Sequence, residues 1–423
     1  MTLIKTSILS FITTLIKIIT GLISVKVVAV YIGPAGTALI GQFNNFVSII
    51  NAFCSGGVNN GIVKYTAEYK NDIEAKKKLW SSSVFLFLLL IIPTALCIII
   101  LSKYLSQKLL KSGEYYSIFI IYAFSLVFYV AYGFIVAVLN GQKEIKKIIS
   151  LNIFSAIFGL LITVLLVYKL RLYGALIAGI IAQSIVFFAA FFFIKNSSWF
   201  SFSLFTGGYD KKVINQLLKY SLMTLVSAFL GPVSQIYLRN YVASHFNWDM
   251  AGCWQAVCQI SNVYLMIITT SISIYYLPRL SEISDKKELK KEISSTYKYL
   301  LPITIIMALG IFVLKDLIIL IVFSEKFMPM RQLFLFQLIG DVFKIASWLL
   351  AYLMIAKAMA RVFIISEIFF VSTLVILSVL FMNIYGFQGI SIAYAVNYFL
   401  YAIFCLIYFT RYLNEKQCCQ KEL

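Results

Sequence analysis

The chain has 423 residues, of which 61% are hydrophobic, 16% aromatic and only 13% charged. A water-soluble globule needs more polar cover than this, so the composition excludes a soluble enzyme and indicates a protein partly solvated by lipid. The formal net charge of +19 could suggest a nucleic-acid partner, but such a partner needs a basic face or a soluble domain. Neither is visible in the sequence, and no nucleic acid is expected.

Apolar stretches long enough to cross a bilayer recur along the whole chain. A hydrocarbon core of about 30 Å takes about 20 apolar residues in a helix. The first stretch lacks the short apolar core and cleavage site of a signal peptide, so it is predicted to be retained. Together they predict an all-α polytopic membrane protein with about twelve transmembrane helices. The predicted spans are 8–30, 39–62, 81–101, 116–139, 149–168, 174–194, 217–241, 252–276, 298–322, 332–356, 362–383 and 388–410.

Basic residues collect in the loops on one side of the predicted membrane. If the N-terminus is inside, the inward loops hold most of the 36 basic residues, including those at 76–78 and 286–291. The outward loops hold few, such as Lys103 and Lys108. This asymmetry follows the positive-inside rule and predicts a multi-pass inner-membrane protein with both termini in the cytoplasm.

Some residues recur at an offset of half the chain. Asn51 and Asn262 are 211 residues apart, as are two further pairs of identical residues. Because many transporters consist of two related bundles, the expected architecture is two six-helix bundles, residues 1–200 and 201–423. Chance identity in a chain rich in Tyr and Gly is the alternative.

Sequence signals of catalysis and of metal or cofactor binding are missing. The sequence contains no phosphate loop, no paired-aspartate metal motif and no His-Glu-x-x-His, and its single histidine, His245, falls in an outward loop. The seven cysteines have no metal-binding spacing. The loops are too short to hold a folded domain. The prediction is a transporter without catalytic residues, metal or cofactor.

Two lysines lie at membrane depth in the first span. A charge at that depth costs about 2.5–3.5 kcal/mol on insertion scales, so each is a functional candidate. Lys17 and Lys26 can both line one polar cavity only if the helix bends, for example at Gly21. Lys26 could instead extend its stem to the headgroups.

Carboxyl groups occur in the tenth and eleventh spans. Asp341 and Lys344 are three residues apart and can neutralise each other on one helix face. Alternatively, Asp341 belongs to a cation or proton site that couples transport to an ion gradient. Glu367 is a second ion-coupling candidate, with a surface pair to Arg361 as its alternative.

Two further basic residues fall near span ends. Arg239 ends the seventh span and Lys64 ends the second, where such residues often only meet lipid headgroups. Combined with Lys17 and Lys344, they would form a positively charged interior. Such a surface suits an anionic, phosphate-bearing cargo.

Amide side chains interrupt the second and eighth spans. The second contains Asn44 and Asn51, and the eighth contains Gln255 and Asn262. Buried amides can join helices by hydrogen bonds. Their number in two corresponding helices favours the other interpretation, a wet path whose amides and aromatic rings suit sugars.

Ordered motifs spread over most of the chain form a further pattern. They are Gly33-Pro34-Ala35-Gly36, 60–69 (NGIVKYTAEY), Trp254, 260–262 (ISN), Tyr264-Leu265, 276–281 (YLPRLS), Lys326-Phe327, Met330-Arg331, 337–341 (QLIGD), Lys344, 355–358 (IAKA) and Arg361. In this order they resemble the bacterial Wzx-type polysaccharide repeat-unit flippases. The resemblance is strongest to the branch that contains O-antigen translocases and the lipid III flippase of enterobacterial common antigen.

This resemblance implies a fold like that of the multidrug and toxin extrusion transporters, with two six-helix bundles around a central cavity and alternating access. The implied cargo is an undecaprenyl-pyrophosphate-linked oligosaccharide, moved from the cytoplasmic to the periplasmic leaflet of the inner membrane of a Gram-negative bacterium. Besides inner-membrane lipid, the implied partners are an O-antigen polymerase and a chain-length regulator. Asn262 and Asn44 depart from the family pattern, which has an acidic and a basic residue there, so neither is assigned a charge role.

The leading hypothesis from sequence is therefore a flippase for an O-antigen repeat unit, with a lipid III flippase as the alternative. Lys17, Lys26, Arg239 and Lys344 would attract the pyrophosphate, and Asp341 and Glu367 would couple the cycle to an ion gradient. A multidrug exporter of the same fold would need more carboxylates than bases in its cavity. A membrane-bound polymerase or glycosyltransferase would need larger loops.

Overall fold

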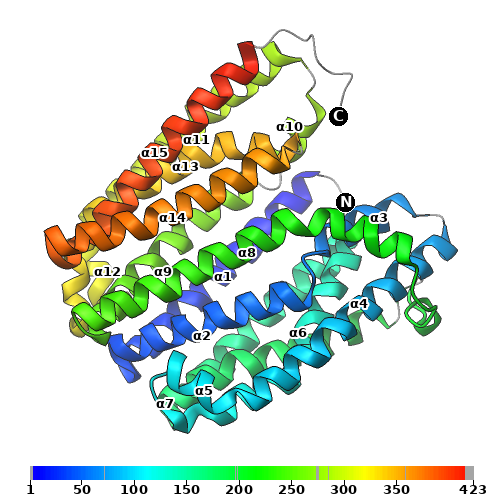
Figure 1. The fold of residues 1–423 in the computed structure, drawn as a ribbon, viewed down its shortest axis with the longest axis horizontal. Helices are drawn as coiled ribbons and strands as arrows, with labels where there is room; N and C mark the ends of the chain where they lie inside the picture. Colours follow the sequence, from blue (N-terminus) through cyan, green and yellow to red (C-terminus); the bar gives the residue numbers. More distant parts are fainter. Residues whose placement is uncertain are drawn as a thin grey trace. The chain divides into compact units, whose positions relative to one another are not determined.

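The computed structural model describes residues 3–70, 72–195, 197, 199–272, 276–283, 285–357 and 359–414. Over these residues the chain is built of helices joined by short turns, with no β-strand (Figure 1). Packing divides it into two compact units, one up to Ile236 and one from Tyr237. The division falls inside a helix. The predicted bundle boundary between residues 200 and 201 stays a prediction.

The first unit begins with a long helix and includes most of the helix that crosses into the second unit. Its helices are α1 (Leu3–Tyr31), α2 (Gly33–Cys54), α3 (Asn59–Glu68), α4 (Ile73–Ile100), α5 (Ser102–Leu109), η1 (Gly113–Tyr115), α6 (Tyr116–Gly141), α7 (Ile145–Ile194), η2 (Phe202–Leu204) and α8 (Lys211–His245). Within it, α7 packs against α1 and α6, and α4 packs against α6.

Local sequence explains where several of these helices begin, bend or end. Asp72 caps α4 by accepting a hydrogen bond from the backbone N–H of Ala75 at 2.9 Å. The 50-residue α7 consists of two helices joined by a kink at Arg171, whose φ is +51°. The guanidinium of Arg171 lies over the Tyr31 ring, 4.9 Å from its centroid, which ties this kink to the end of α1.

An aromatic core fills the first unit. Trp80, Phe119 and Tyr122 are fully buried there. The Trp80 indole N–H donates to Thr66 Oγ1 at 3.0 Å, which satisfies a polar atom that lipid could not. At Gly141, an added Cβ would lie 2.6 Å from the Cβ of Thr66, so α3 and α6 approach closely only because glycine occupies this position.

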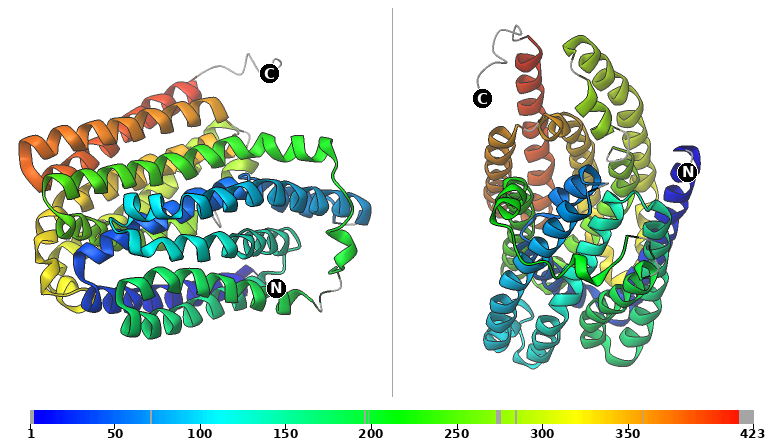
Figure 2. Two further views of the ribbon diagram at one scale, coloured as in Figure 1. Left: turned by 60° about the horizontal axis from the view of Figure 1, so that its bottom comes forward. Right: turned by 90° about the vertical axis from the view of Figure 1, so that its right-hand side faces the viewer.

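The second unit is organised around one central helix. Besides the end of α8 it contains α9 (Trp248–Ser271), α10 (Leu277–Glu282), α11 (Lys286–Val313), α12 (Lys315–Val322), η4 (Glu325–Leu333), α13 (Phe334–Ala356), α14 (Ala360–Tyr385), η5 (Gly386–Gln388) and α15 (Gly389–Asn414). Helix α13 packs against α9, α11, α14 and α15. Figure 2 shows α14 (orange) and α15 (red) running side by side within this unit.

The helices confirm the predicted fold class. By length and hydropathy, eight described helical segments could cross a membrane, or nine if α2 and α3, bent by 44° at their break, form one span. Two of the eight, Ile145–Ile194 and Ala360–Leu413, each contain two predicted spans. The predicted span 217–241 lies in α8, which is not among the eight. The twelve predicted spans are consistent with these helices.

Candidate transport site

A buried carboxylate lies at the centre of the second unit. Asp341 on α13 is fully buried. Its oxygens accept hydrogen bonds from Ser261 Oγ at 2.6 Å, Tyr264 Oη at 2.9 Å and Tyr394 Oη at 2.8 Å. Ser261 and Tyr264 are three residues apart on α9 and therefore share one face, while Tyr394 comes from α15. Three helices thus converge on one ionisable group.

The three donors to Asp341 are all hydroxyls. A hydroxyl can accept a hydrogen bond as well as donate one, whereas an amide N–H or an ammonium group can only donate. A protonated Asp341 could therefore donate to one of its present partners without any change of neighbours. This arrangement can hold the carboxyl group in either protonation state.

Lys344, one turn along α13, is surrounded by aromatic rings. Its Nζ lies 4.9 Å from the Trp348 ring centroid, 5.5 Å from that of Tyr398 and 5.8 Å from that of Tyr394. Contacts of this kind stabilise an ammonium by about 0.5–2 kcal/mol, depending on how far it is desolvated. Lys344 and Asp341 do not form an ion pair within 4 Å, so the mutual neutralisation considered for them takes no such direct form here. Their charges interact at longer range, with Tyr394 touching both.

A second basic group is buried where α8 faces α9. Arg239 is fully buried, and its guanidinium donates a hydrogen bond to Gln255 Oε1. The same guanidinium lies over the Trp254 ring, 5.8 Å from its centroid. Cys258, one turn beyond Trp254, lies close enough to both Arg239 and Asp341 to interact electrostatically with each. Gln255, which was predicted to line the path, is the hydrogen-bond acceptor of Arg239.

The second predicted ion-coupling residue is partly buried. Glu367 on α14 does not form an ion pair with Arg361 within 4 Å. Glu367 interacts electrostatically with Lys344, and Tyr398 interacts with both of these side chains. The charge of Lys344 therefore acts on two carboxyl groups, that of Asp341 on α13 and that of Glu367 on the neighbouring α14.

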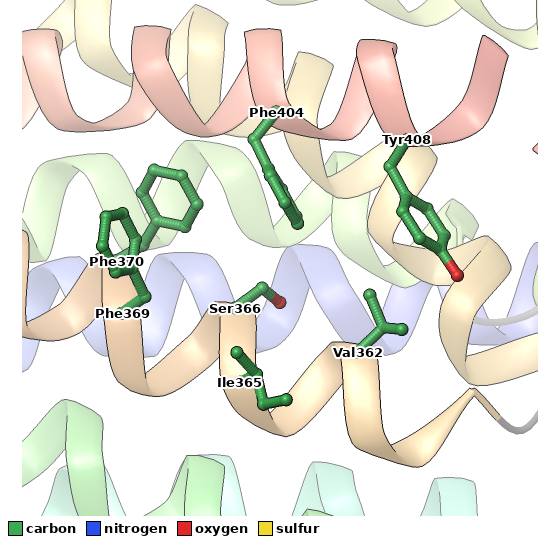
Figure 3. A pocket seen from close by; sticks show the side chains of 7 residues that line it. All are labelled: Val362, Ile365, Ser366, Phe369, Phe370, Phe404 and Tyr408. Atoms are coloured by element: carbon green, nitrogen blue, oxygen red, sulfur yellow. The ribbon is translucent and has the colours of Figure 1, made fainter. Parts of the chain in front are cut away.

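An apolar pocket of about 470 Å³ lies between α14 and α15 (Figure 3). One of its lining residues, Ser366, directly precedes Glu367 in the sequence. Seven residues line it: Val362, Ile365, Ser366, Phe369, Phe370, Phe404 and Tyr408. In Figure 3 the aromatic rings of both helices project into the space between the two ribbons, and the Ser366 hydroxyl is the small polar group among them. No charged side chain lines this pocket.

In the first unit, the predicted lysines lie at exposed or half-buried positions. Lys17 is exposed and its Nζ donates to Asn152 Oδ1 on α7 at 3.0 Å. Helix α1 continues unbroken through Gly21 to Tyr31, past the half-buried Lys26. Lys64 is exposed and lies over the Tyr65 ring, 5.4 Å from its centroid.

The predicted amides differ in their surroundings. Asn51 is half-buried and its Oδ1 accepts from Tyr122 Oη at 3.3 Å, a contact between helices α2 and α6. Asn44 and Asn262 are exposed on α2 and α9. On α9, Asn262 lies beside Ser261 but does not reach Asp341.

Three aromatic residues of the cluster around Asp341 and Lys344 were not predicted as site residues from sequence. One is Trp348 on α13, and the other two are Tyr394 and Tyr398 on α15. The signal of the two tyrosines was a spacing of four residues within an otherwise apolar span, which places both hydroxyls on one helix face.

The helical fold with buried ionisable groups has counterparts among solved structures of membrane transporters. An inward-facing multidrug resistance transporter of the MATE family superposes with a TM-score of 0.78 over 94% of each chain, at 15% identity. A MOP-superfamily transporter from Pyrococcus furiosus gives 0.69 over 95% of each, at 14% identity. Identities this low establish the fold alone.

Sequence comparison identifies the family. The model of the polysaccharide biosynthesis protein family matches residues 27–332. The chain is 30% identical over 410 residues to the lipid III flippase of Escherichia coli (strain K12), which covers 96% of this chain and 97% of that protein. The lipid III flippase of Shigella flexneri matches equally. The chain therefore belongs to the polysaccharide biosynthesis protein family, and these comparisons confirm the prediction of a multi-pass transporter rather than an enzyme.

Proposed function

We propose that this protein is an inner-membrane flippase that moves a lipid-linked oligosaccharide of the lipid III type to the periplasmic leaflet by alternating access. The observation that supports this most directly is the match, along nearly the whole of both chains, to proteins that are lipid III flippases. The sequence alone placed an O-antigen repeat unit first and lipid III second. The relatives favour lipid III, and the proposal follows them.

Basic side chains would bind the anionic head of the cargo, and amide side chains would bind its sugars. In the second unit the basic side chains are Arg239 and Lys344, each held beside aromatic rings. In the first unit they are Lys17, Lys26 and Lys64. Lys and Arg donate charge-assisted hydrogen bonds to phosphate oxygens, which matches the predicted undecaprenyl pyrophosphate anchor. The amides predicted to contact the sugars are Asn44 and Asn51 in the first unit and Gln255 and Asn262 in the second.

Asp341 would couple transport to a proton gradient. Its three hydroxyl partners can serve a charged or a neutral carboxyl group, and Lys344 supplies a positive charge close by. Cargo phosphate drawn to Lys344 would compete with Asp341 for that positive charge. Binding of the cargo and protonation of Asp341 are then linked, because weakening the influence of the Lys344 charge favours the neutral carboxyl group. Glu367 would act through the same lysine.

The experiment uses cells that assemble lipid III but lack their own flippase. Appearance of the lipid-linked oligosaccharide on the periplasmic side is measured with and without this protein, at equal expression in the membrane. We expect wild type to restore it, and Asp341→Asn and Lys344→Gln to reduce it at least tenfold. Lys298→Gln, which removes the same charge from an exposed position on α11, serves as the control and should match wild type.

The same assay in cells that make only an O-antigen repeat unit distinguishes the two cargoes. Activity there and not with lipid III would reverse the choice of cargo. If a well-expressed protein moved neither, the multidrug exporter of the same fold would become the leading hypothesis.

A further inference from the structure

A second apolar cavity, of about 410 Å³, opens between α11 and α15 on the second unit, with α13 as its floor. Its walls are aliphatic and aromatic, and one charged side chain, Lys290, joins the lining. Its walls include Ile293 and Tyr297 on α11, Phe343 and Ala346 on α13, and Phe399 and Ala402 on α15. We call this cavity the α11–α15 groove.

Positive charge is concentrated at one end of the groove. The first two turns of α11 contain Lys286, Lys287, Lys290 and Lys291. Lys286 Nζ donates to the Tyr412 carbonyl at 2.7 Å, and so bridges α11 to the last turn of α15. Lys290 follows one turn later, on the same face of α11 as Ile293 and Tyr297. The groove is thus apolar along its length and basic at its mouth.

The acidic residues of this segment do not neutralise Lys290. Arg279 lies within 4.0 Å of the carboxylates of Glu282, Glu288 and Glu292, at 3.8, 2.8 and 4.0 Å. Among the described residues, no carboxylate lies within 4.0 Å of Lys290. Arg279 therefore occupies the local acidic groups, and the charge of Lys290 is left for an anion from outside.

The mouth of the groove has the side chains typical of a membrane surface. Lys290 and Tyr297 precede the predicted span of α11, and the groove residues on α15 lie in its last five turns. Lys and Tyr are both enriched at the level of the lipid headgroups. An apolar slot that begins at this level and continues into the bilayer matches a lipid, with a phosphate at the top and a chain below.

We propose that the α11–α15 groove binds an anionic phospholipid of the surrounding leaflet, with its chain against α13 and its phosphate against Lys290. The pocket between α14 and α15 provides the contrast, because it is equally apolar but no charged residue lines it, and it has no basis for headgroup selection. Positions 402 and 406 on α15 line the groove, whereas 404 and 408 line the other pocket, so the two cavities lie on different faces of one helix.

Such a lipid would also contact the helix of the candidate transport site. Phe343 and Ala346 flank Lys344 in sequence, and Tyr297 donates a hydrogen bond to the Ala346 carbonyl at the floor of the groove. Chain binding would therefore hold α13 from the face opposite to Asp341. The proposal depends on the membrane location of the protein and not on the identity of its cargo.

The test measures lipids retained by the purified full-length protein, by native mass spectrometry, after titration with phosphatidylglycerol or phosphatidylcholine. We expect wild type to retain phosphatidylglycerol preferentially. Lys290→Gln should weaken this binding about fivefold, the factor that one lysine at an anionic membrane surface supplies. Lys291→Gln, an equal loss of charge at an exposed position outside the lining, should lose less binding than Lys290→Gln, because it only reduces the general positive charge at the mouth.

A second pair of variants tests the chain. Ala402→Phe fills the α11–α15 groove and should abolish retention, whereas Ser366→Phe fills the other pocket and should not. Monodisperse elution of each variant establishes that it folds. Equal binding of the two phospholipids, equal losses in Lys290→Gln and Lys291→Gln, or full retention in Ala402→Phe would each overturn the proposal. Displacement of the phospholipid by polyprenyl phosphate at lower concentration would assign the groove to the cargo's tail instead, and would overturn it too.

Discussion

The partners of Asp341 set what that residue can do. An ionised carboxylate only accepts hydrogen bonds, and here it receives them from two helices at once. Each bond between helices in a membrane protein contributes on average about 0.6 kcal/mol, and at most about 1.7 kcal/mol. Single losses should therefore be tolerated by the fold while they alter the electrostatics of the site.

Tyr264→Phe tests this expectation. The change removes the 2.9 Å hydrogen bond from α9 to Asp341 and keeps the ring. We expect the free energy of unfolding to fall by about 0.5–1.7 kcal/mol, and flipping to fall further than this loss explains. Unfolding in detergent and flipping in cells measure the two effects.

Tyr408→Phe is the matched control for that variant. Its hydroxyl donates to the sulfur of Met359 at 3.7 Å, and its side chain lines the pocket between α14 and α15. Flipping should stay at the wild-type level. If both variants lost flipping alike, the hydrogen bond to Asp341 would not be the cause.

At the scale of helices, the site depends on a close approach of α13 to α15. A Cβ added at Gly340 would lie 2.3 and 2.7 Å from two ring atoms of Tyr394, and 3.1 Å from the Cα of Ala395. The ring could move, but it would then leave Asp341, and the backbone of α15 could not move without shifting the helix. Glycine at 340 thus places the Tyr394 hydroxyl on the neighbouring carboxylate.

Gly340→Ala should therefore disrupt the site through the helix packing. We expect a destabilisation of about 1–3 kcal/mol from the overpacked contact and a loss of flipping comparable to that of Asp341→Asn. Gly310→Ala in α11 is the control, since its Cβ would meet nothing within 4 Å. That variant should be neutral or slightly stabilising because alanine favours a helix. The melting temperatures of the two variants should move in opposite directions or differ by several degrees.

The break between α2 and α3 shows what hydropathy could not predict. The predicted span 39–62 runs across it, yet the chain turns at Ser55–Val58, where Gly56 and Gly57 have φ values of +55° and +64°. The glycine pair was visible in the sequence, but a glycine pair is compatible with a continuous helix as well as with a turn. Asp341 was predictable because a charge at membrane depth is costly, whereas Tyr394 was not, because choosing it requires knowing that α15 packs on α13.

At the scale of the whole chain, the distribution of lysine and arginine predicts which side of the membrane each loop occupies. Translocation of a basic loop is disfavoured, so the loops richest in these residues stay inside. The turn at Gln142–Glu144 between α6 and α7, followed by Lys146 and Lys147, is predicted to be cytoplasmic, and the turn at Lys111 before α6 is predicted to be periplasmic. Both termini are predicted to lie on the cytoplasmic side as well.

Reporter fusions test this topology in intact cells. Alkaline phosphatase, which is active only outside the cytoplasm, should be active when inserted at Lys111 and inactive when inserted at Lys143 or joined to the C-terminus. A fluorescent protein that matures only in the cytoplasm should give the opposite result at the same three positions. The opposite pattern at all three positions would mean that the chain is inverted in the membrane. It would move Lys290 and the mouth of the α11–α15 groove to the periplasmic leaflet, where the anionic phospholipid would then have to be found. A reversed signal at the C-terminus alone would instead indicate an odd number of crossings, and α8, which is not among the eight described segments that could cross a membrane, would be the first helix to remove from the membrane.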